Sequence, residues 1–346
     1  MVITGLDQHK HFSRVAVTDE AGAVIEEQRL GHADKDIIAR YFEPFKGNAK
    51  IAMESTGNWT WMCDLLEGQG LDVHLAHPLK TRIICESKVK TDKIDARMLA
   101  HLLRANLLAE SYIAPLDVRS QRQQLRYRQS LIRVRTGLKN RVHGVLEQLG
   151  IAVPPVSDLF GKEGLSWLNS LAIAEPYAAS MQGYLRLIRE IDLLITAVDK
   201  EIKQSLKTNP AASLLDTIPG IGTFTAQLLL AEIGDIRRFA STKKLCSYAG
   251  LVPSTHQSGE TLYHGSITKQ GNRYIRWAMT EAAQKAYCKD HYLARFYATI
   301  YRKKGKAKAI TAVARKLLVS VYHVLIKNEP YRIPGKPVER AGQLSL

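Results

Sequence analysis

The stretch Lys90-Thr91-Asp92-Lys93-Ile94-Asp95-Ala96-Arg97-Met98-Leu99-Ala100 places two acids three residues apart at the start of a predicted helix. Good helix formers continue to Leu108, and apolar residues recur at helical spacing. Asp92 and Asp95 then lie side by side on one helix face. Neighbouring carboxylates repel each other unless a cation lies between them, so the pair is a candidate metal site. The alternative is a solvated first turn whose acids meet the positive end of the helix dipole.

Two further acids close predicted strands upstream of this helix. A short apolar run at 2–6 ends in Asp7, and a second at 50–53 ends in Glu54. The other predicted elements here are strands at 12–18, 23–30 and 72–76, helices at 34–42 and 59–68, and a connecting segment at 77–90. The predicted order is three strands, helix, strand, helix, strand, helix.

This order, with acids at the ends of the first and fourth strands, is that of the ribonuclease H type of nuclease fold. Asp7, Glu54, Asp92 and Asp95 together resemble the Asp-Glu-Asp-Asp signature of transposases with a RuvC-like nuclease domain. Within them, the chain resembles the insertion-sequence recombinases related to the Piv DNA invertase over nearly its whole length. The resemblance implies an α/β RNase H/RuvC-like domain over 1–110, DNA as substrate, and guidance by a bridge RNA that the element encodes.

The four acids suit a two-metal phosphodiester reaction. Two Mg²⁺ ions about 4 Å apart stabilise both the attacking and the leaving oxygen. Mg²⁺ takes hard oxygen ligands, so acids without His or Cys fit it. We therefore expect Mg²⁺, as two ions, on these four carboxylates.

Composition favours a nucleic-acid enzyme. Forty-nine Lys and Arg against 33 Asp and Glu give a formal charge of +16, which favours binding of DNA or RNA backbones. The four cysteines are scattered with no Cys-x-x-Cys spacing, so neither a disulfide framework nor a zinc site is indicated. The sequence has no signal peptide and no run of about 18 apolar residues, so we expect no membrane contact. The expected location is the cytoplasm of a bacterial or archaeal cell, at the nucleoid.

The region 111–209 is predicted as a basic coiled-coil hairpin with an insert. Residues 119–141 hold eight Arg or Lys and no acid, while an apolar stripe continues to Leu149. A second apolar stripe from Tyr184 to Leu206 predicts the returning arm. The arginines expected to meet phosphate are Arg119, Arg122, Arg126, Arg133 and Arg135.

A mainly α-helical transposase domain is expected over 210–330, followed by a loose tail at 331–346. Its start, Ile218-Pro219-Gly220-Ile221-Gly222, resembles a helix-hairpin-helix, in which backbone N–H groups near Gly220 and Gly222 hold a phosphate. A structural turn between two core helices is the alternative.

The family resemblance implies a nucleophilic Ser in this domain. The Ser-Gly step after Gly250-Leu251-Val252-Pro253 makes Ser258 the choice, with Ser247, Ser254 and Ser266 as rivals. A serine hydroxyl that attacks a phosphodiester conserves the bond energy in a phosphoserine linkage. Without the resemblance, a Ser in a Gly-containing loop is a turn residue.

The segment 269–316 holds thirteen Lys or Arg against Glu281 and Asp290. Its expected phosphate contacts are Lys269, Arg273, Arg276, Lys303 and Lys304. Aromatic side chains among these charges either stack on unpaired bases or fill the core.

The sequence thus predicts a DNA recombinase that works as a dimer or tetramer, because two duplexes are joined and the serine and the acids lie on separate domains. One rival is a RuvC-like metal nuclease that cuts with water and forms no covalent intermediate. The other rival is a nucleic-acid-binding protein without catalysis.

Overall fold

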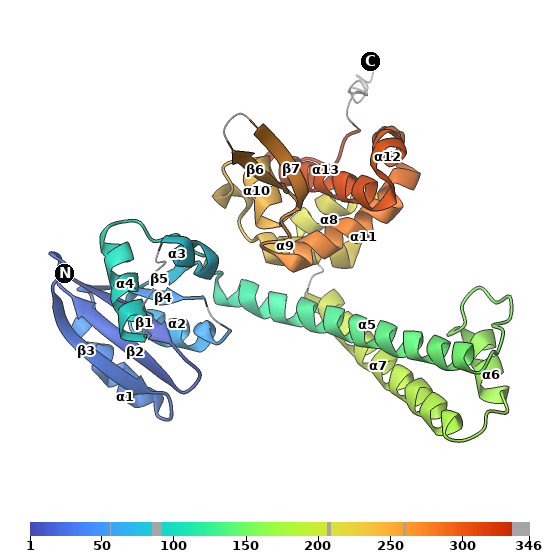
Figure 1. The fold of residues 1–346 in the computed structure, drawn as a ribbon, viewed down its shortest axis with the longest axis horizontal. Helices are drawn as coiled ribbons and strands as arrows, with labels where there is room; N and C mark the ends of the chain where they lie inside the picture. The colour runs from blue at the N-terminus through green and yellow to red at the C-terminus, as the bar shows by residue number, and fades with distance from the viewer. Residues whose placement is uncertain (56, 85–91, 206–208, 259–260, 334–346) are drawn as a thin grey trace, which may run out of the picture. The chain divides into compact units, whose positions relative to one another are not determined.

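The computed structural model describes residues 1–55, 57–84, 92–205, 209–258 and 261–333. The chain divides into two compact units, Met1–Ala114 and Pro115–Leu346. The first is a mixed α/β unit and the second is mostly helical (Figure 1).

The N-terminal unit is built on a five-stranded sheet with the order β3-β2-β1-β4-β5. The strands are β1 (Val2–Gln8), β2 (Phe12–Thr18), β3 (Val24–Gly31), β4 (Ala49–Glu54) and β5 (Asp72–Ala76). The first three pair antiparallel, whereas β4 runs parallel to both β1 and β5. The carboxyl ends of β1, β4 and β5 therefore meet at one edge.

Helices cover both faces of this sheet. They are α1 (Lys35–Phe42), α2 (Trp59–Gly68), α3 (Pro78–Ile84) and α4 (Asp92–Arg104), with a 3-10 turn η1 (Glu43–Phe45). Residues of α1 and α2 pack with Leu6, Ile51 and Met53 in one core cluster, while Leu99 of α4 packs with Ala52 on the other face. Because side chains alternate along a strand, Gly5, Asp7, Ala52 and Glu54 share the face that α4 covers.

The predicted elements of this unit agree with the observed ones to within one or two residues, with two exceptions. The helix predicted to reach Leu108 ends at Arg104. The predicted connecting segment 77–90 contains α3, and its residues 85–90 lie outside the described residues, as do 56 and Thr91.

The C-terminal unit begins with two long helices. They are α5 (Leu116–Gln148) and α7 (Tyr177–Ser205), with α6 (Lys162–Ser170) between them (Figure 1). Gln124 contacts Glu201, Arg128 contacts Asp199 and Arg135 contacts Asp192. Since α7 numbers fall as α5 numbers rise, the two helices run antiparallel. The observed α5 begins three residues before the basic stretch predicted at 119–141, and it ends at Gln148, next to the end of the predicted apolar stripe at Leu149.

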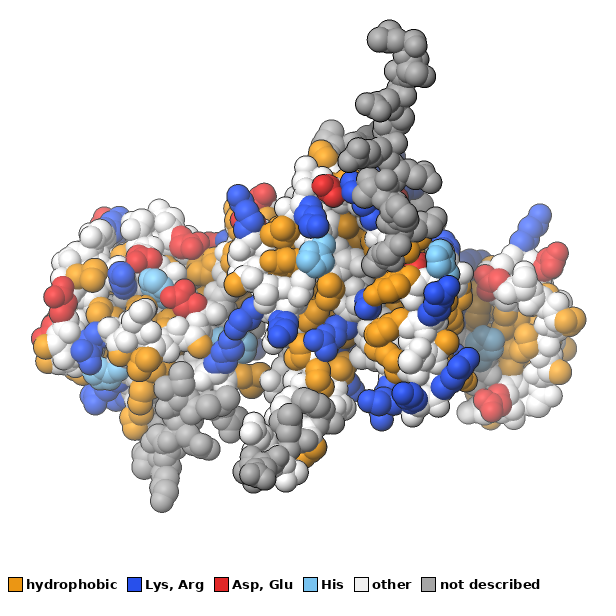
Figure 2. All heavy atoms as spheres, turned by 90° about the horizontal axis from the view of Figure 1, so that it is seen from above, with side chains coloured by type: hydrophobic (Ala, Val, Ile, Leu, Met, Phe, Trp, Pro, Cys, Tyr) orange, Lys and Arg blue, Asp and Glu red, His pale blue; other side chains and the backbone are white. Residues whose placement is uncertain are grey.

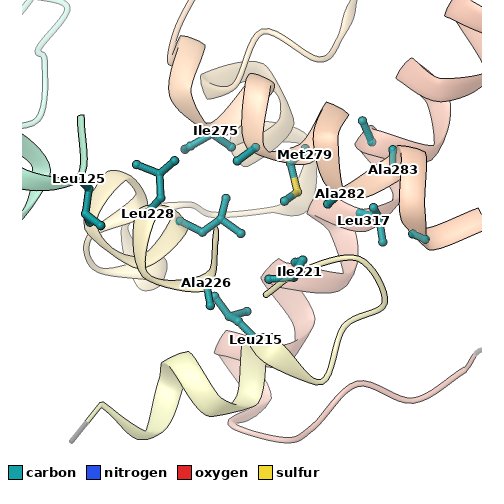
Figure 3. Close-up of a cluster of buried hydrophobic side chains, with 14 of the residues drawn as sticks. Leu125, Leu215, Ile221, Ala226, Leu228, Ile275, Met279, Ala282, Ala283 and Leu317 are labelled. Atoms are coloured by element: carbon teal, nitrogen blue, oxygen red, sulfur yellow. The ribbon is translucent and has the colours of Figure 1, made fainter. Parts of the chain in front are cut away.

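The rest of the unit is a helical bundle with one β-hairpin. Its elements are α8 (Pro210–Asp216), α9 (Thr223–Ile233), η2 (Ile236–Arg238), α10 (Thr242–Tyr248), β6 (Pro253–Ser258), β7 (Thr261–Ile267), α11 (Arg273–Lys289), α12 (His291–Lys304) and α13 (Lys306–Lys327). Leu125 of α5 joins Leu228 of α9 and Ile275 of α11 in the core (Figure 3). The base of the long hairpin and the bundle therefore share one hydrophobic core.

Helix α13 is the only described helix long and apolar enough to cross a membrane by length and composition. Val313, Leu317 and Val321 of this helix are fully buried within the C-terminal unit. Its apolar face is accounted for as part of the protein core.

Candidate active site

Asp7 and Glu54 lie at the carboxyl ends of adjacent parallel strands. Leu6 pairs with Met53 in the β1–β4 register, and each acid is the next residue along its strand. Both side chains belong to the face that α4 covers. The two strand ends that the sequence predicted therefore come together at one edge of the sheet.

Helix α4 brings the second pair of acids to this edge. It crosses the sheet directly over Gly5, where no side chain separates helix from strand. Lys93 and Arg97, from the same helix, bind Glu27 of β3 and fix the orientation of α4. Asp92 and Asp95 consequently lie in its first turn, near Asp7.

His9 lies beside these acids, although no role was predicted for it from the sequence. Its Nε2 lies 3.0 Å from Asp7 Oδ2 and 3.3 Å from Asp92 Oδ2. The imidazole also stacks on Phe12, with ring centroids 4.6 Å apart. Asp7, His9 and Asp92 could together hold a metal ion, since their ligand atoms lie within 4.8 Å of one another. The signal in the sequence was its position two residues after Asp7, which puts it on the same side of the chain.

Asp7 is a buried carboxyl group that lies close to other acids. Burial raises the pKa of Asp7 above its ordinary value, the neighbouring His9 lowers it, and the charges of Asp95 and Asp92 raise it further. The net direction is upward. A bound cation would relieve the repulsion that raises this pKa.

Two amide side chains connect the loops that follow β1 and β4. Gln8 donates from Nε2 to the carbonyl oxygen of Asn58 at 3.1 Å, and Asn58 donates from Nδ2 to the carbonyl oxygen of His9 at 3.0 Å. Gln8 is almost fully buried. These reciprocal bonds fix the loop after Glu54 against the residues that follow Asp7, and so hold the edge of the sheet in one geometry.

The donor set fits a divalent cation. Carboxylate oxygens are the ligands that Mg²⁺ takes, and an imidazole nitrogen beside them also suits Mn²⁺. Asp92 keeps 46% of its side chain exposed, whereas Asp7 keeps 13%. The site thus combines a buried acid on β1 with a solvent-exposed acid on α4.

The candidate nucleophile lies in the C-terminal unit. The sequence predicted a loop for Ser258, but it ends strand β6, where it pairs with Thr261 of β7. Its side chain is outside the described part of the structure, as are residues 259 and 260. Among the rivals, Ser247 and Ser266 are exposed, and Ser254 is half-buried with its Oγ against Gly265.

Two arginines that the sequence assigned to phosphate have internal partners. Arg126 binds the buried Glu232 through two parallel hydrogen bonds, from Nε to Oε1 at 2.7 Å and from Nη2 to Oε2 at 2.8 Å. Arg122 donates to the carbonyl oxygens of Ala231 and Glu232. Burial lowers the pKa of Arg122. Burial also acts to lower the pKa of Arg126, but the hydrogen bonds and the charge of Glu232 outweigh it, so the pKa of Arg126 is raised.

Arg135 and Arg276 also bind within the protein. Arg135 pairs with Asp192 of α7 at 2.6 Å, and Arg276 donates to the carbonyl oxygen of Ala249 at 2.9 Å. A run of Arg without nearby acids in the sequence therefore does not predict a free basic face, because the acids come from α7 and α9. Arg122, Arg126, Arg135 and Arg276 therefore each have a partner within the protein.

The remaining predicted phosphate contacts keep solvent access. Arg133, Lys269, Arg273, Lys303 and Lys304 are exposed, and Arg119 is half-buried. In the space-filling view, Lys and Arg side chains lie among hydrophobic ones over the C-terminal part, with few acids between them (Figure 2). A basic surface thus remains after the internal pairs are removed.

The two glycines of the predicted helix-hairpin-helix differ. Gly220 has a positive φ of 83°, and a β carbon there would lie 2.3 Å from the carbonyl oxygen of Ala282 in α11. Position 220 therefore requires a glycine, because any side chain would clash with α11. Gly222 is exposed and is the N-cap of α9, so its position remains compatible with a phosphate.

Comparison with known proteins places both units in one family. A family model of DEDD transposases of the IS110 type, described as a transposase, matches residues 4–151, and the model "Transposase IS116/IS110/IS902 family" matches residues 212–298. The first contains all four acids of the N-terminal unit. The second spans the β-hairpin whose first strand, β6, ends at Ser258.

Similar proteins agree with these matches. The transposase for insertion sequence element IS1111A of Coxiella burnetii is 26% identical over 339 residues, which are 95% of this chain and 91% of that protein. The transposase for insertion sequence element IS1328 of Yersinia enterocolitica is 28% identical over 68% of this chain and 70% of its own. The pilin gene-inverting protein of Moraxella bovis is 39% identical over 40% of this chain and 45% of its own. The acidic edge, the helical unit and these relatives together establish that the chain belongs to the IS110/IS116 family of DEDD transposases and is a DNA transposase.

Proposed function

We propose that this transposase cuts DNA with divalent metal, preferably Mg²⁺, held by Asp7, Glu54, Asp92 and Asp95. The observation that carries the proposal is the convergence of Asp7 and Asp92 on one nitrogen of His9 at 3.0 and 3.3 Å, with Asp95 close enough to raise the pKa of Asp7. When bound, the metal supplies charge stabilisation for the attacking and leaving oxygens of a phosphodiester. The strand order and the position of the acids support a RuvC-like, ribonuclease H type fold.

The chain's own residues have distinct tasks at this edge. Asp7 is the buried anchor, while Asp92 and Asp95 meet the ligand from α4. His9 holds Asp7 and Asp92 together and reduces their repulsion. Gln8 and Asn58 keep the two strand ends in register.

The second part of the proposal is a covalent step at Ser258. Its Oγ would form a bond to phosphorus as the bond from phosphorus to a deoxyribose oxygen breaks. The serine proton leaves, and the departing oxygen takes up a proton. The phosphoserine ester conserves the bond energy until the hydroxyl of a different strand attacks it and releases the serine. Relatives named for insertion sequences and for inverting a pilin gene support a reaction in which broken ends are joined to new partners.

The covalent step separates this proposal from the rival metal nuclease. The test uses a radiolabelled plasmid with the element and its native flanks, incubated with protein, the RNA transcript of the flank and Mg²⁺, and then denatured. The wild-type chain should carry labelled DNA, and Ser258→Ala should not. Ser247→Ala, Ser254→Ala and Ser266→Ala serve as matched controls that keep the adduct. Free ends without adduct would make the chain a nuclease, and intact DNA over a full divalent-metal series would leave only the binding function.

We also propose that target choice resides in a bridge RNA transcribed from the element's flank. The sequence offers backbone-binding cations but no zinc-finger spacing and no basic zipper to read a long site. RNA copurified with the protein from cells that carry the native flanks should be complementary to the target. Insertion that stays at the old target after the pairing loops are changed would contradict this.

An assembly of two or four copies follows from joining two duplexes. The long antiparallel hairpin of α5 and α7, proposed as a coiled coil, has exposed Leu187, Leu193 and Leu194 on α7, which are suited to contact another copy. Light scattering of the chain, alone and with DNA, tests this: a monomer under both conditions would contradict it.

A further inference from the structure

A cleft in the C-terminal unit has no role in the reaction described above. It has a volume of about 950 Å³. Its lining residues come mainly from the β6–β7 hairpin, α12 and α13, which are labelled in Figure 1. All of its lining residues belong to the described part of this one unit. The cleft touches the base of the hairpin near Pro253 and Ile267, at the opposite end from Ser258.

The floor of the cleft is apolar. Its apolar lining includes Leu251, Ile267, Phe296, Ile300 and Val319. Lys316 is held over the rings of Phe296 and Tyr292, with Nζ 4.7 and 4.9 Å from their centroids. An apolar floor beside a fixed cation favours a flat, partly apolar group with a negative charge attached.

The rim of the cleft is cationic. Its charged lining residues are Lys269, Lys303, Lys304, Lys308, Arg315 and Lys316, and its lining contains no Asp or Glu. Across His291–Lys327 the sequence has nine Lys or Arg and no acid. Among the described residues, none of the six rim cations has an ion pair with a carboxylate in the structure. Six like charges around one hollow repel each other, and a polyanion relieves that repulsion.

Lys308 of the rim and Lys306, which precedes it but does not line the cleft, lie where a helix disfavours cations. Lys306 and Lys308 lie in the first turn of α13, which has no acid there. Cations at a helix N-terminus meet the positive end of the dipole and destabilise the helix. A residue choice that costs local stability without a structural partner is typical of a functional surface.

We propose that this cleft binds a single-stranded DNA segment, with phosphates on the rim lysines and an unpaired base on the apolar floor. A duplex keeps its bases paired and stacked, so it can offer the rim its phosphates but offers the floor nothing. A single strand satisfies both surfaces, because every base has an apolar face that stacks on aromatic side chains. The proposal rests on the proposed strand cutting only as the source of single-stranded DNA.

The test measures binding by the full chain and does not use transposition. Fluorescence anisotropy follows a labelled 15-mer of deoxythymidine, a duplex of the same length, and a 15-mer of uridine. The cleft variant is Lys303→Gln/Lys304→Gln/Lys308→Gln. The control Lys162→Gln/Lys200→Gln/Lys203→Gln removes the same charge from exposed positions of α6 and α7. A second cleft variant, Ile300→Gln, changes the floor and leaves the charges in place.

We expect the cleft triple variant to lower the slope of log affinity against log salt for the deoxythymidine strand by about 2, since each lost phosphate contact contributes about 0.7. Ile300→Gln should weaken single-strand binding and leave duplex binding unchanged. The control triple variant should bind the single strand as the wild-type chain does. Ser258→Ala should also bind normally, so that failure of the covalent step and failure of the cleft are told apart.

Three results would overturn the proposal. They are a cleft variant that matches the control, an equal loss of single-strand and duplex binding, and binding of the uridine strand without the deoxythymidine strand. The last result would assign the cleft to RNA. Circular dichroism melting of each variant excludes misfolding as the cause of a loss.

Discussion

Gly5 of β1 faces the carbonyl oxygen of Ala96 in α4 so closely that a β carbon on residue 5 would lie 1.8 Å from that oxygen. The backbone nitrogen of Ala100 would be 2.7 Å away. Because Ala96 and Ala100 are one turn apart, a full turn of α4 rests on the strand at this glycine. The approach positions Asp92 and Asp95, one turn earlier, against Asp7.

Gly5→Ala should therefore displace α4 and take the acids apart. Overpacking against backbone cannot be relieved by a rotamer change, so we expect destabilisation at the upper end of the roughly 1–3 kcal/mol range. Metal-dependent stabilisation and strand cutting should be lost together. Gly31→Ala is the matched control, since a β carbon there meets no atom within 4 Å. Thermal melting with and without Mg²⁺ measures the stability and its dependence on metal, and cleavage of a labelled plasmid measures strand cutting. Full activity of Gly5→Ala would show that α4 does not need this contact.

Asp7→Asn should raise the melting temperature of the metal-free chain near neutral pH. Burial and the charges of Asp95 and Asp92 raise the folded pKa of Asp7 above the unfolded value. Protonated Asp7 stabilises the fold fully below the unfolded pKa, and this contribution is lost as pH rises through the folded pKa. The increase in melting temperature of Asp7→Asn over the wild-type chain should therefore become smaller as the solution is acidified. Glu67→Gln, on the exposed side of α2, should follow the wild-type profile. A fall in melting temperature for Asp7→Asn would mean that the Asp7 carboxylate stabilises the fold through its charge, by pairing with His9 or another cation.

Added Mg²⁺ or Mn²⁺ should raise the melting temperature of the wild-type chain. Metal at about ten times its dissociation constant stabilises the folded state by about 1.4 kcal/mol. Asp92→Asn should abolish this rise in melting temperature, because it removes one of the proposed metal ligands. Asp92 and Asp7 both contact the same nitrogen of His9. Differential scanning fluorimetry over a metal series tests this, and an undiminished shift in Asp92→Asn would place the metal elsewhere.

Glu232→Gln should destabilise the C-terminal unit strongly. Glu232 is fully buried and binds Arg126 and Asn272. Loss of its charge costs about 3 kcal/mol, the lower end for breaking a buried ion pair, since Arg126 keeps 35% exposure. Urea denaturation gives the value. Asp235→Asn, in an exposed pair with Arg237, should leave the midpoint unchanged, and equal effects of the two variants would contradict a role for burial.

Arg133→Glu should weaken DNA binding without a change in stability. Arg133 is exposed on α5, whereas Arg126 on the same helix is bound to Glu232. A lost phosphate contact on duplex DNA lowers the slope of log affinity against log salt by about 0.9. Arg126→Glu should instead unfold the base of the hairpin. A salt series of anisotropy titrations decides, and an unchanged slope for Arg133→Glu would mean that this face of α5 does not meet DNA.

The sequence predicted most of the N-terminal unit because its signals are local. Alternating apolar strands that end in Asp7 and Glu54, and a helix that opens with Asp92 and Asp95, need no knowledge of the rest of the chain. His9 was missed because its role comes from Asp92, which is far along the chain but 3.3 Å away in space. The role of Gly5 was missed for the same reason, because a glycine in a strand does not indicate which distant helix packs against it.

The basic helix shows what periodicity and charge counts leave out. Residues 119–141 contain no acid, so the arginines of α5 were assigned to phosphate. Three of these arginines form ion pairs with acids from other helices, namely Glu232, Asp199 and Asp192. The β-hairpin that carries Ser258 was predicted as a loop, since its polar residues lack the apolar alternation of a half-buried strand.

The pairing of Arg126 with Glu232 has a mechanical consequence. Thirty-three residues of α5 extend about 50 Å at the usual helical rise. About a third of the way along α5, Arg126 links it through Glu232 to Asn272, whose side chain caps the start of α11. A rod fixed at that point acts as a lever arm, so a load at the tip near α6 is delivered as torque to the first turn of α11. Whatever holds the far end of the hairpin can thereby tilt the bundle that carries the β-hairpin.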